Sequence, residues 1–329
     1  MAKPIIIVGG GIAGLCAGIA LQKLGLEAIV YERNPDPTVV GAGIIIAPNA
    51  LQALGPFGVA EKIMDEGYES NGFHMLTDQG SFITKMLVPN GFQSMYAIHR
   101  SELHRHLLEA LKPGTVKWGK ICDQIEHGNE CVKVHFHDHS AVEGALLIAA
   151  DGIHSPIRKS IYSENRYRYA LVNAEANDPV LAAYSPQDLY ERFRNYHEPI
   201  PSLLESTLGN RMIHRDVVDI EPMEQFYADR IAFIGDAAHA ITPNMGQGAC
   251  QAIEEAASRA IVSLYMNLKG LKAISFRNGS MSWLLSLYLV TKNRNTLRRN
   301  DGTTFIKSSP STVVGGFFPF RWGSSDILM

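Results

Sequence analysis

Hydrophobic positions in the first 32 residues follow the pattern of a strand, a helix and a second strand. Ile5–Val8 is a run of β-branched residues, which predicts a short buried strand. Apolar residues recur at helical spacing over Leu15–Leu24, and Gly25 follows them as a typical helix stop. Glu27–Tyr31 is the next apolar run. Together these segments predict a βαβ unit of about 30 residues.

Further along the chain, the pattern predicts a second amphipathic helix, several short strands and two later helices. Arg100–Leu111 places four leucines on one helical face. Gly246–Leu268 has the spacing of a long helix, and Pro186–Tyr196 is compatible with a shorter one. Strand-like runs lie near Val116, at Ile121–Ile125, at Val132–Phe136 and at Ala145–Ala150.

Two glycine-rich turns follow predicted strands. The first lies in Pro4–Gly14, which reads PIIIVGGGIAG, and the second in Ile231–Cys250, which reads IAFIGDAAHAITPNMGQGAC. Each turn opens a helix, and the first N–H groups of a helix have no intrahelical partner and attract anions. Two such turns on one sheet favour an elongated cofactor that is held along its length.

The first turn has residues suited to a pyrophosphate. Gly9 permits the tight turn out of the strand, Gly11 lets the backbone approach a phosphate, and Gly14 lets the helix pack closely on the strand. Ile12 and Ala13 then supply the first N–H groups of the helix.

Glu32 lies 18 positions after Gly14, at the end of the second predicted strand. A carboxylate in this place accepts hydrogen bonds from an adenosine ribose. The alternative interpretation is a glycine-rich turn followed by an ordinary surface glutamate.

Composition narrows the class of protein. At 329 residues the chain is long enough for two domains, and 46% hydrophobic and 19% charged residues are typical of a globular protein. The net charge of −3 gives no reason to expect a nucleic-acid partner. The start, MAKPIIIVGG, lacks the apolar stretch of a signal peptide, and no run approaches the roughly 20 residues of a membrane span. Four widely separated cysteines predict reduced thiols and a cytoplasmic location: Cys16, Cys122, Cys131 and Cys250.

Ordered motifs along the chain give a resemblance to a known family. They are GGGIAG at residues 9–14, Glu32–Arg33, Gly41–Ile44, Asp151–Arg158 and Gly235–His239. With them the chain resembles the FAD-dependent aromatic hydroxylases. These are single-component flavoprotein monooxygenases that include salicylate- and para-hydroxybenzoate-hydroxylase-like enzymes. The resemblance covers roughly residues 3–160 and 228–265.

The resemblance implies a set of FAD-binding residues. Glu32 would hold the adenosine ribose, Arg33 would lie beside the adenine end, and Arg100 would contact the flavin side. Asp236 would bind the ribityl and pyrophosphate region. For Arg100 a surface ion pair is the alternative, and for Asp236 a role as helix cap. The full implied set is Gly9, Gly11, Ile12, Ala13, Gly14, Glu32, Arg33, Gly43, Arg100, Asp151, Asp236, Pro243, Gly246 and Gly248.

Two further motifs acquire roles from the resemblance. Asp151–Gly152, with Ser155 and Arg158, matches a motif shared between FAD and NAD(P)H binding, and an arginine suits the phosphates of a nicotinamide cofactor. The alternative is an ordinary strand-to-helix turn.

The second glycine-rich turn acquires a role at the flavin ring. Backbone N–H groups at Gly246–Gly248 would face the N1–C2=O edge of the flavin, where reduction places negative charge, and Pro243 would flank the ring. The alternative is a helix start without a ligand.

The implied activity is NAD(P)H-dependent monooxygenation of an aromatic or electron-rich small molecule. FAD would take a hydride from NADPH or NADH, react with O2, and pass oxygen to the substrate from a C4a-hydroperoxide. No residue can be named as a catalytic acid or base. The alternatives are a flavin oxidase or reductase without hydroxylation, or a truncated, non-catalytic FAD-binding paralogue. The protein would be a monomer or a homodimer.

The expected fold is α/β, with a Rossmann-like, doubly wound FAD-binding domain over residues 1–71, 99–160 and 228–269. A smaller, mostly β substrate-covering region would comprise 72–98 and 161–227. This region is shortened, because Gly235 lies only 84 positions after Asp151 (235 − 151). Residues 270–329 are expected to form a tail, in which the basic Lys292–Arg299 is a solvated segment rather than a membrane-surface contact.

The histidines give no metal site on sequence grounds. His135, His137 and His139 alternate along the chain, but neighbouring polar residues favour the end of a hairpin. His104 and His106 are two positions apart on a helix and do not share a face. His239 is expected to be a loop residue.

Overall fold

The computed structural model describes residues 3–37, 43–88, 93–128, 131–162, 167–169, 178–206, 218–220, 222–223, 225–241, 243 and 246–257. The chain divides into one compact unit, Met1–Ile274 with Leu328–Met329, and a second unit, Ser275–Ile327. The second unit lies outside the described residues, and so do the predicted tail at 270–329 and the helix predicted beyond residue 257.

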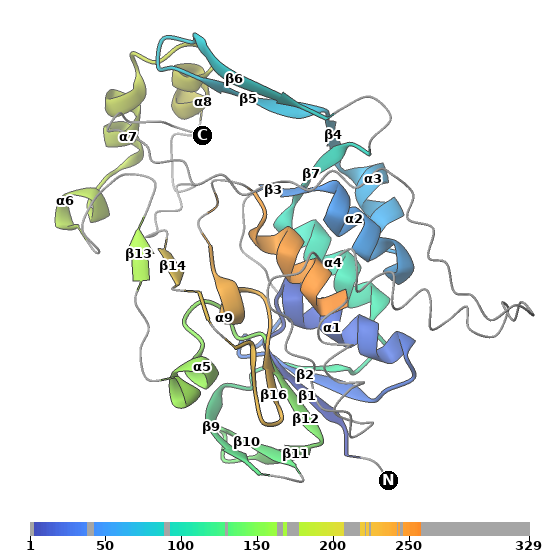
Figure 1. The fold of residues 1–329 in the computed structure, drawn as a ribbon. Helices are drawn as coiled ribbons and strands as arrows, with labels where there is room; N and C mark the ends of the chain where they lie inside the picture. Colours follow the sequence, from blue (N-terminus) through green and yellow to red (C-terminus); the bar gives the residue numbers. More distant parts are fainter. Residues whose placement is uncertain are drawn as a thin grey trace, which may run out of the picture. The chain divides into compact units, whose positions relative to one another are not determined.

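A six-stranded sheet forms the centre of the first unit, with the strand order β15-β16-β12-β1-β2-β8 (Figure 1). Neighbouring strands are parallel except β15, which pairs antiparallel with β16. The strands are β1 (Ile5–Val8), β2 (Ala28–Tyr31), β8 (Val116–Lys117), β12 (Leu146–Ala149), β15 (Tyr227–Ala228) and β16 (Ile231–Phe233). Helix α1 (Ile12–Lys23) connects β1 to β2, so the predicted βαβ unit is confirmed.

The sheet separates two hydrophobic cores. Successive side chains of a strand point to opposite faces. Accordingly, Ile5 and Ile7 of β1 belong to a core that includes residues of α1 and α4 (Arg100–Ala110). Ile6 and Val8 belong to the core on the other face. The Rossmann-like α/β fold class is thereby confirmed.

The second face of the central sheet is covered by strands as well as helices. A three-stranded antiparallel sheet of order β11-β10-β9 contributes Val132, Val134 and Phe136 to its core. Two short helices complete this layer. The elements are β9 (Cys122–His127), β10 (Val132–Phe136), β11 (Ala141–Gly144), α5 (Pro156–Ile161) and α9 (Asp236–His239).

Additional elements pack on the helical side. Residues 248–257 are helical, which confirms part of the predicted 246–268 helix. A second antiparallel sheet has the order β3-β7-β4. The elements on this side are β3 (Gly43–Ile46), α2 (Pro48–Leu54), η1 (Gly55–Phe57), α3 (Ala60–Glu66), β4 (Tyr68–Ser70) and β7 (Met95–His99).

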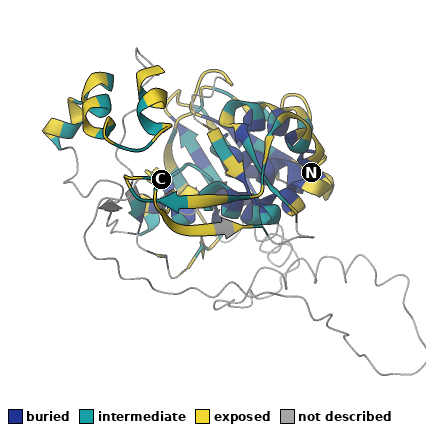
Figure 2. Ribbon diagram, turned by 90° about the horizontal axis from the view of Figure 1, so that it is seen from above, coloured by how far each residue is buried: buried dark blue, intermediate teal, exposed yellow. Residues whose placement is uncertain are grey.

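The predicted covering region contains more helix than the sequence indicates. Its described parts are β5 (Gly72–Leu76), β6 (Phe82–Leu87), β13 (Tyr167–Tyr169), α6 (Pro179–Ala182), α7 (Pro186–Phe193), α8 (Ile200–Ser206) and β14 (Val218–Ile220). The helix expected at 186–196 is present as α7, and Ser185 and Asp188 form a capping box at its start. None of these three helices has a buried residue, in contrast to the central sheet (Figure 2).

Candidate cofactor site

Four neighbouring parallel strands end at the same edge of the central sheet. Gly9 follows β1, Glu32 follows β2, Asp151 follows β12 by two positions, and Asp236 follows β16. Backbone hydrogen bonds align these strand ends, for example from Gly9 N to Tyr31 O at 2.9 Å. Ligands of open α/β sheets bind at this edge. The structure therefore gathers motifs that are far apart in the sequence.

The glycines of the first turn are required for different reasons. A Cβ atom on Gly9, whose φ is +110°, would collide with the carbonyl oxygen of Ala150, and one on Gly14 would collide with that of Gly9. A Cβ on Gly11 would meet no protein atom within 4 Å. Packing therefore explains Gly9 and Gly14, whereas the open position at Gly11 leaves room for a ligand.

The open position lies at the start of α1, where no side chain caps the helix. Its first N–H groups, at Ile12 and Ala13, have no intrahelical partner and can bind an anion. This donor set fits the pyrophosphate of a dinucleotide cofactor.

Glu32 lies directly beside this turn and is 7% exposed. Its Oε2 accepts a hydrogen bond from Gly10 N at 2.5 Å, and its Oε1 accepts one from Asn34 N at 2.9 Å. A carboxylate has about four lone-pair sites, so two acceptor positions remain for ribose hydroxyls. Arg33 is exposed next to it.

Asp151 forms hydrogen bonds inside its own motif. Its Oδ2 accepts a hydrogen bond from Ile157 N at 3.3 Å, and its buried Oδ1 has no partner among the described residues. Burial raises the pKa of Asp151 above its ordinary value, although the Ser155 hydroxyl and, to a smaller extent, the Ile157 N–H act in the opposite direction. Ser155 caps α5 by accepting a hydrogen bond from Arg158 N at 2.9 Å.

Arg158 does not have the position expected of a nicotinamide ligand. Its side chain is 2% exposed, and its Nη1 donates to Ala237 O at 2.7 Å and to Asp236 O at 3.3 Å. Its Nη2 donates to Ile153 O. The expectation of a phosphate contact is corrected accordingly, because these backbone carbonyls engage the guanidinium. Through these hydrogen bonds, Arg158 links the loop after β12 to helix α9.

The helix at 248–257 supplies a site residue that the sequence analysis missed. Glu255 is 3% exposed, and its Oε2 accepts hydrogen bonds from Gly235 N at 3.1 Å and from His239 Nε2 at 2.5 Å. His239 is the last residue of α9, so the prediction of a loop residue was wrong. The available signal was an acidic residue three positions after Ala252, which is buried, and so on the same face of the helix. Glu255 fixes the turn immediately before Asp236.

This pair makes the stability of the fold depend on pH. Burial alone lowers the pKa of His239, but Glu255 outweighs it, so the pKa lies above the ordinary 6.5. The pair therefore stabilises the fold fully below about pH 6.5 and progressively less as pH rises through the raised value. We expect urea unfolding across this range to show that loss in the wild type and a flatter profile in Glu255→Gln. His137→Gln, at an exposed turn position, is the control and should keep the wild-type profile.

The remaining predicted residues lie on neighbouring segments of the site. Gly43 begins β3, and Gly248 begins the 248–257 helix. Cys250 connects the two segments, since its Sγ accepts from Ala47 N at 3.4 Å and donates to Ile45 O at 3.5 Å. Asn49 of α2 also contacts this helix and the residue before it, since its Nδ2 donates hydrogen bonds to Gln247 Oε1 at 3.3 Å and to Glu254 Oε2 at 2.8 Å.

Several predicted residues are exposed to solvent. Arg100 begins α4, which His99 caps by accepting a hydrogen bond from Ser101 N at 3.3 Å. The exposed residues of the predicted set include Arg33, Gly43, Arg100, Asp236, Pro243 and Gly246. Their individual roles toward a cofactor stay predictions.

The chain matches a family model described as an FAD-binding domain over residues 2–202, which is more than half of its length. The chain belongs to this FAD-binding family. FAD is its cofactor, and this match together with the monooxygenase relatives described next confirms the prediction of an FAD-dependent monooxygenase related to the aromatic hydroxylases.

Relatives of this FAD-binding protein are monooxygenases. The aurachin C monooxygenase/isomerase of Stigmatella aurantiaca is 29% identical over 299 residues, which cover 77% of this chain and 78% of the relative. The 3-amino-4-hydroxybenzoate 2-monooxygenase of Streptomyces cremeus is 26% identical, with 76% of each protein covered. The structure of Klebsiella pneumoniae HpxO complexed with FAD and uric acid superposes with a TM-score of 0.67 at 24% identity, covering 87% of this chain and 83% of that one. This last likeness supports the fold.

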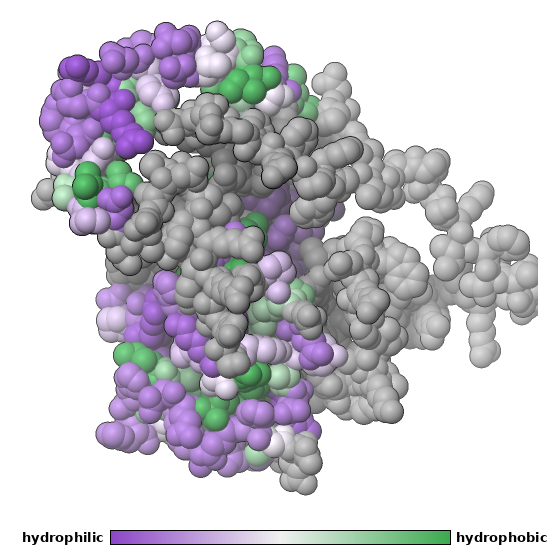
Figure 3. All heavy atoms as spheres, turned by 60° about the vertical axis from the view of Figure 1, so that its left-hand side comes forward, coloured by the Kyte–Doolittle hydropathy of each residue, from purple (hydrophilic) through white to green (hydrophobic). Residues whose placement is uncertain are grey.

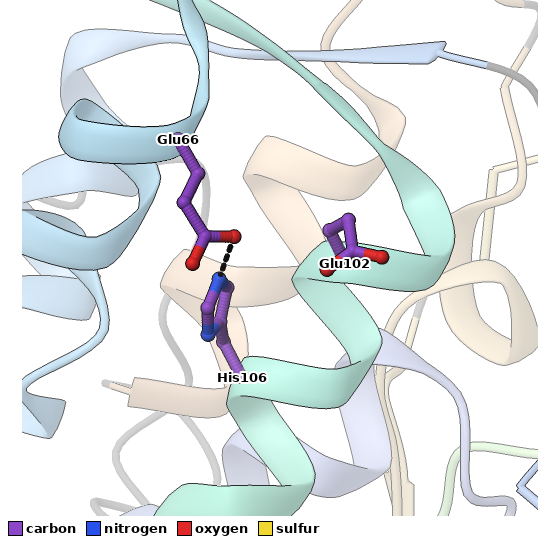
Figure 4. A group of neighbouring side chains, drawn as sticks. All are labelled: Glu66, Glu102 and His106. Carbon is purple, nitrogen blue, oxygen red and sulfur yellow. Dashed lines mark hydrogen bonds and ion pairs between the residues drawn. The ribbon is translucent and has the colours of Figure 1, made fainter.

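Outside the FAD site, the FAD-binding protein has an acidic cluster with a histidine between α3 and α4. His106 is 1% exposed, and its Nε2 lies 2.8 Å from Glu66 Oε2, with Glu102 nearby (Figure 4). Arg105 supplies the balancing positive charge, because it contacts Glu66 at 3.0 Å and Glu102 at 2.8 Å. The cluster is an ion-pair network, and we assign no metal to it.

The histidines near the end of β10 behave as the sequence predicts. His135 pairs with Glu126 at 2.7 Å, and His137 and His139 lie in the turn between β10 and β11. Within the part of the chain that the structure describes, no helix is long and apolar enough to cross a membrane.

Proposed function

We propose that the chain uses NADPH or NADH, together with O2, to hydroxylate an aromatic or similarly electron-rich small molecule. The observation that supports this proposal most is the open Gly11 position at the start of α1, beside the buried Glu32. The monooxygenase names of the relatives support the reaction class.

Each part of the site would hold a different part of the cofactor. The Gly11, Ile12 and Ala13 amides would bind the pyrophosphate, and Glu32 would accept hydrogen bonds from the ribose. The amides of Gly246–Gly248 would stabilise negative charge at the flavin pyrimidine edge. FAD supplies hydride acceptance and O2 activation, while the protein contributes binding and orientation.

An absorption spectrum of the purified chain tests the proposal directly. We expect bound flavin bands that bleach when NADPH or NADH is added under argon and return with air. Hydroxylated product should then form from a suitable aromatic compound. Correctly folded, colourless protein that ignores added FAD in calorimetry would contradict the proposal.

A flavin oxidase or reductase is the second candidate, and the shortened covering region favours it. Only 84 positions separate Asp151 from Gly235 (235 − 151), and the described covering elements expose apolar side chains (Figure 3). The most exposed of these are Phe82 and Val180, both at 68%. A flavin–oxygen intermediate requires protection from water. Hydrogen peroxide release equal to nicotinamide consumption, with every aromatic tested, would favour this candidate.

We also propose the domain division 1–71, 99–160 and 228–269 for FAD and 72–98 with 161–227 for the substrate. A cytoplasmic location is part of the proposal, supported by free cysteines at Cys16, Cys122, Cys131 and Cys250. Gel filtration of the full chain would decide between a monomer and a homodimer.

A further inference from the structure

The backbone of Gly10 is held from two sides by buried side chains. Its N–H donates to Glu32 Oε2 at 2.5 Å, and its carbonyl oxygen lies 2.7 Å from Nε2 of His104 in α4. Both side chains are buried, with 7% of Glu32 and 6% of His104 exposed. Gly10 stands in the middle of three consecutive glycines, the most flexible backbone available to a chain. Two elements outside the turn thus restrain its conformation.

The chemistry of the contact fixes the protonation of His104. A carbonyl oxygen can only accept a hydrogen bond, so Nε2 carries a proton and donates it. Burial lowers the pKa of His104 below its ordinary value, and nearby Arg100 acts in the same direction, while Glu32 and the bond to Gly10 oppose them. His104 is therefore a neutral imidazole with its hydrogen on Nε2 at neutral pH.

The position of the Gly10 carbonyl determines the direction of the next amide. The peptide bond between Gly10 and Gly11 is trans, and in a planar trans peptide the C=O and the N–H point in opposite directions. With the carbonyl directed at His104, the Gly11 N–H points away from α4. No described residue accepts a hydrogen bond from this amide, and a Cβ on Gly11 would project into open space.

We propose that His104 is a positioning residue for the pyrophosphate of the cofactor. The hydrogen bond from His104 to the Gly10 carbonyl orients the Gly11 N–H toward the ligand before binding. Binding then does not incur the entropy cost of ordering the three glycines. The inference rests on the proposed FAD site but assigns a role to a residue of α4 that does not itself touch the cofactor.

The test compares binding by His104→Leu, His104→Gln and His106→Gln in the full-length chain. Leucine removes the donor, whereas the glutamine amide can still donate to the Gly10 carbonyl. His106 is the matched control, since it is also a buried histidine of α4 but contacts Glu66. Titration calorimetry would measure dissociation constants for FAD, for ADP and for riboflavin, which has no pyrophosphate, and thermal unfolding would be recorded for each apoprotein.

We expect His104→Leu to weaken FAD and ADP binding about three- to tenfold, the effect of one lost hydrogen bond. Riboflavin binding should not change, and His104→Gln should recover most of the affinity. Wild-type affinity for FAD in His104→Leu would overturn the inference, as would no recovery in His104→Gln. Wild-type protein that binds ADP but not FAD would contradict the proposed function alone, because the ADP comparison still reports on His104.

Discussion

Replacing Gly11 with valine should abolish FAD binding while the apoprotein remains folded. Gly11 caps α1 with φ −75° and ψ −175°, an extended conformation that valine adopts readily. A Cβ there meets no protein atom within 4 Å, so the fold has no reason to exclude it. The added branches would occupy the place of the pyrophosphate. We expect an affinity loss of at least about a hundredfold, or about 2.8 kcal/mol, measured by calorimetry with FAD.

Gly14→Ala is the contrasting variant in the same turn. Its single added methyl would collide with the carbonyl oxygen of Gly9, which is backbone and cannot move aside without shifting α1 from the sheet. We expect an unfolding free energy lower by about 3 kcal/mol or more. If Gly11→Val unfolded the protein and Gly14→Ala did not, the division between a ligand-facing and a packing glycine would be wrong.

Replacing Arg158 with alanine should produce the largest loss of stability outside the hydrophobic cores. The guanidinium donates to the carbonyl oxygens of Ala237, Asp236 and Ile153, and its removal leaves buried acceptors without donors and a cavity beside α9. Unpaired buried groups are costly. We expect a loss of about 3–5 kcal/mol in urea unfolding.

Lys159→Ala is the matched control for Arg158, since Lys159 is the next residue of α5 and is exposed. Its stability should stay within about 0.5 kcal/mol of wild type. A different result would support the contact with nicotinamide phosphates that the sequence suggested for Arg158. If Arg158→Ala were as stable as wild type but bound NADPH poorly, Arg158 would be a nicotinamide ligand after all.

The sequence predicted the central fold because its local signals are strong. The apolar run at Ile5–Val8, the helical spacing of Leu15–Leu24 and the stop at Gly25 each correspond to an observed element or boundary. Glu32 could be placed because a strand end is defined by where its apolar run stops. These are features that a few neighbouring residues determine.

The contacts that join distant motifs could not be predicted in the same way. Nothing near Arg158 in the sequence indicates that its partners are carbonyls 78 and 79 positions later. Glu255 and His104 likewise contact backbone of other elements, and a backbone atom leaves no signature in the sequence. The helices at 178–206 were partly missed because they carry no buried residue, and burial is what produces periodicity.

The hydrophobic pattern of strand β1 does not by itself fix its alignment with the neighbouring strands. Its four residues, Ile5, Ile6, Ile7 and Val8, are all large, apolar and buried, so both faces of the strand are equivalent in hydrophobicity. A slip by one residue would exchange the two faces without exposing a polar group, and the alternation that usually specifies strand alignment carries no information here. The close fit of Gly9 against Ala150, the residue after β12, allows only one alignment of β1 with β12. The glycine turn that suits the cofactor therefore also determines how β1 aligns with β12.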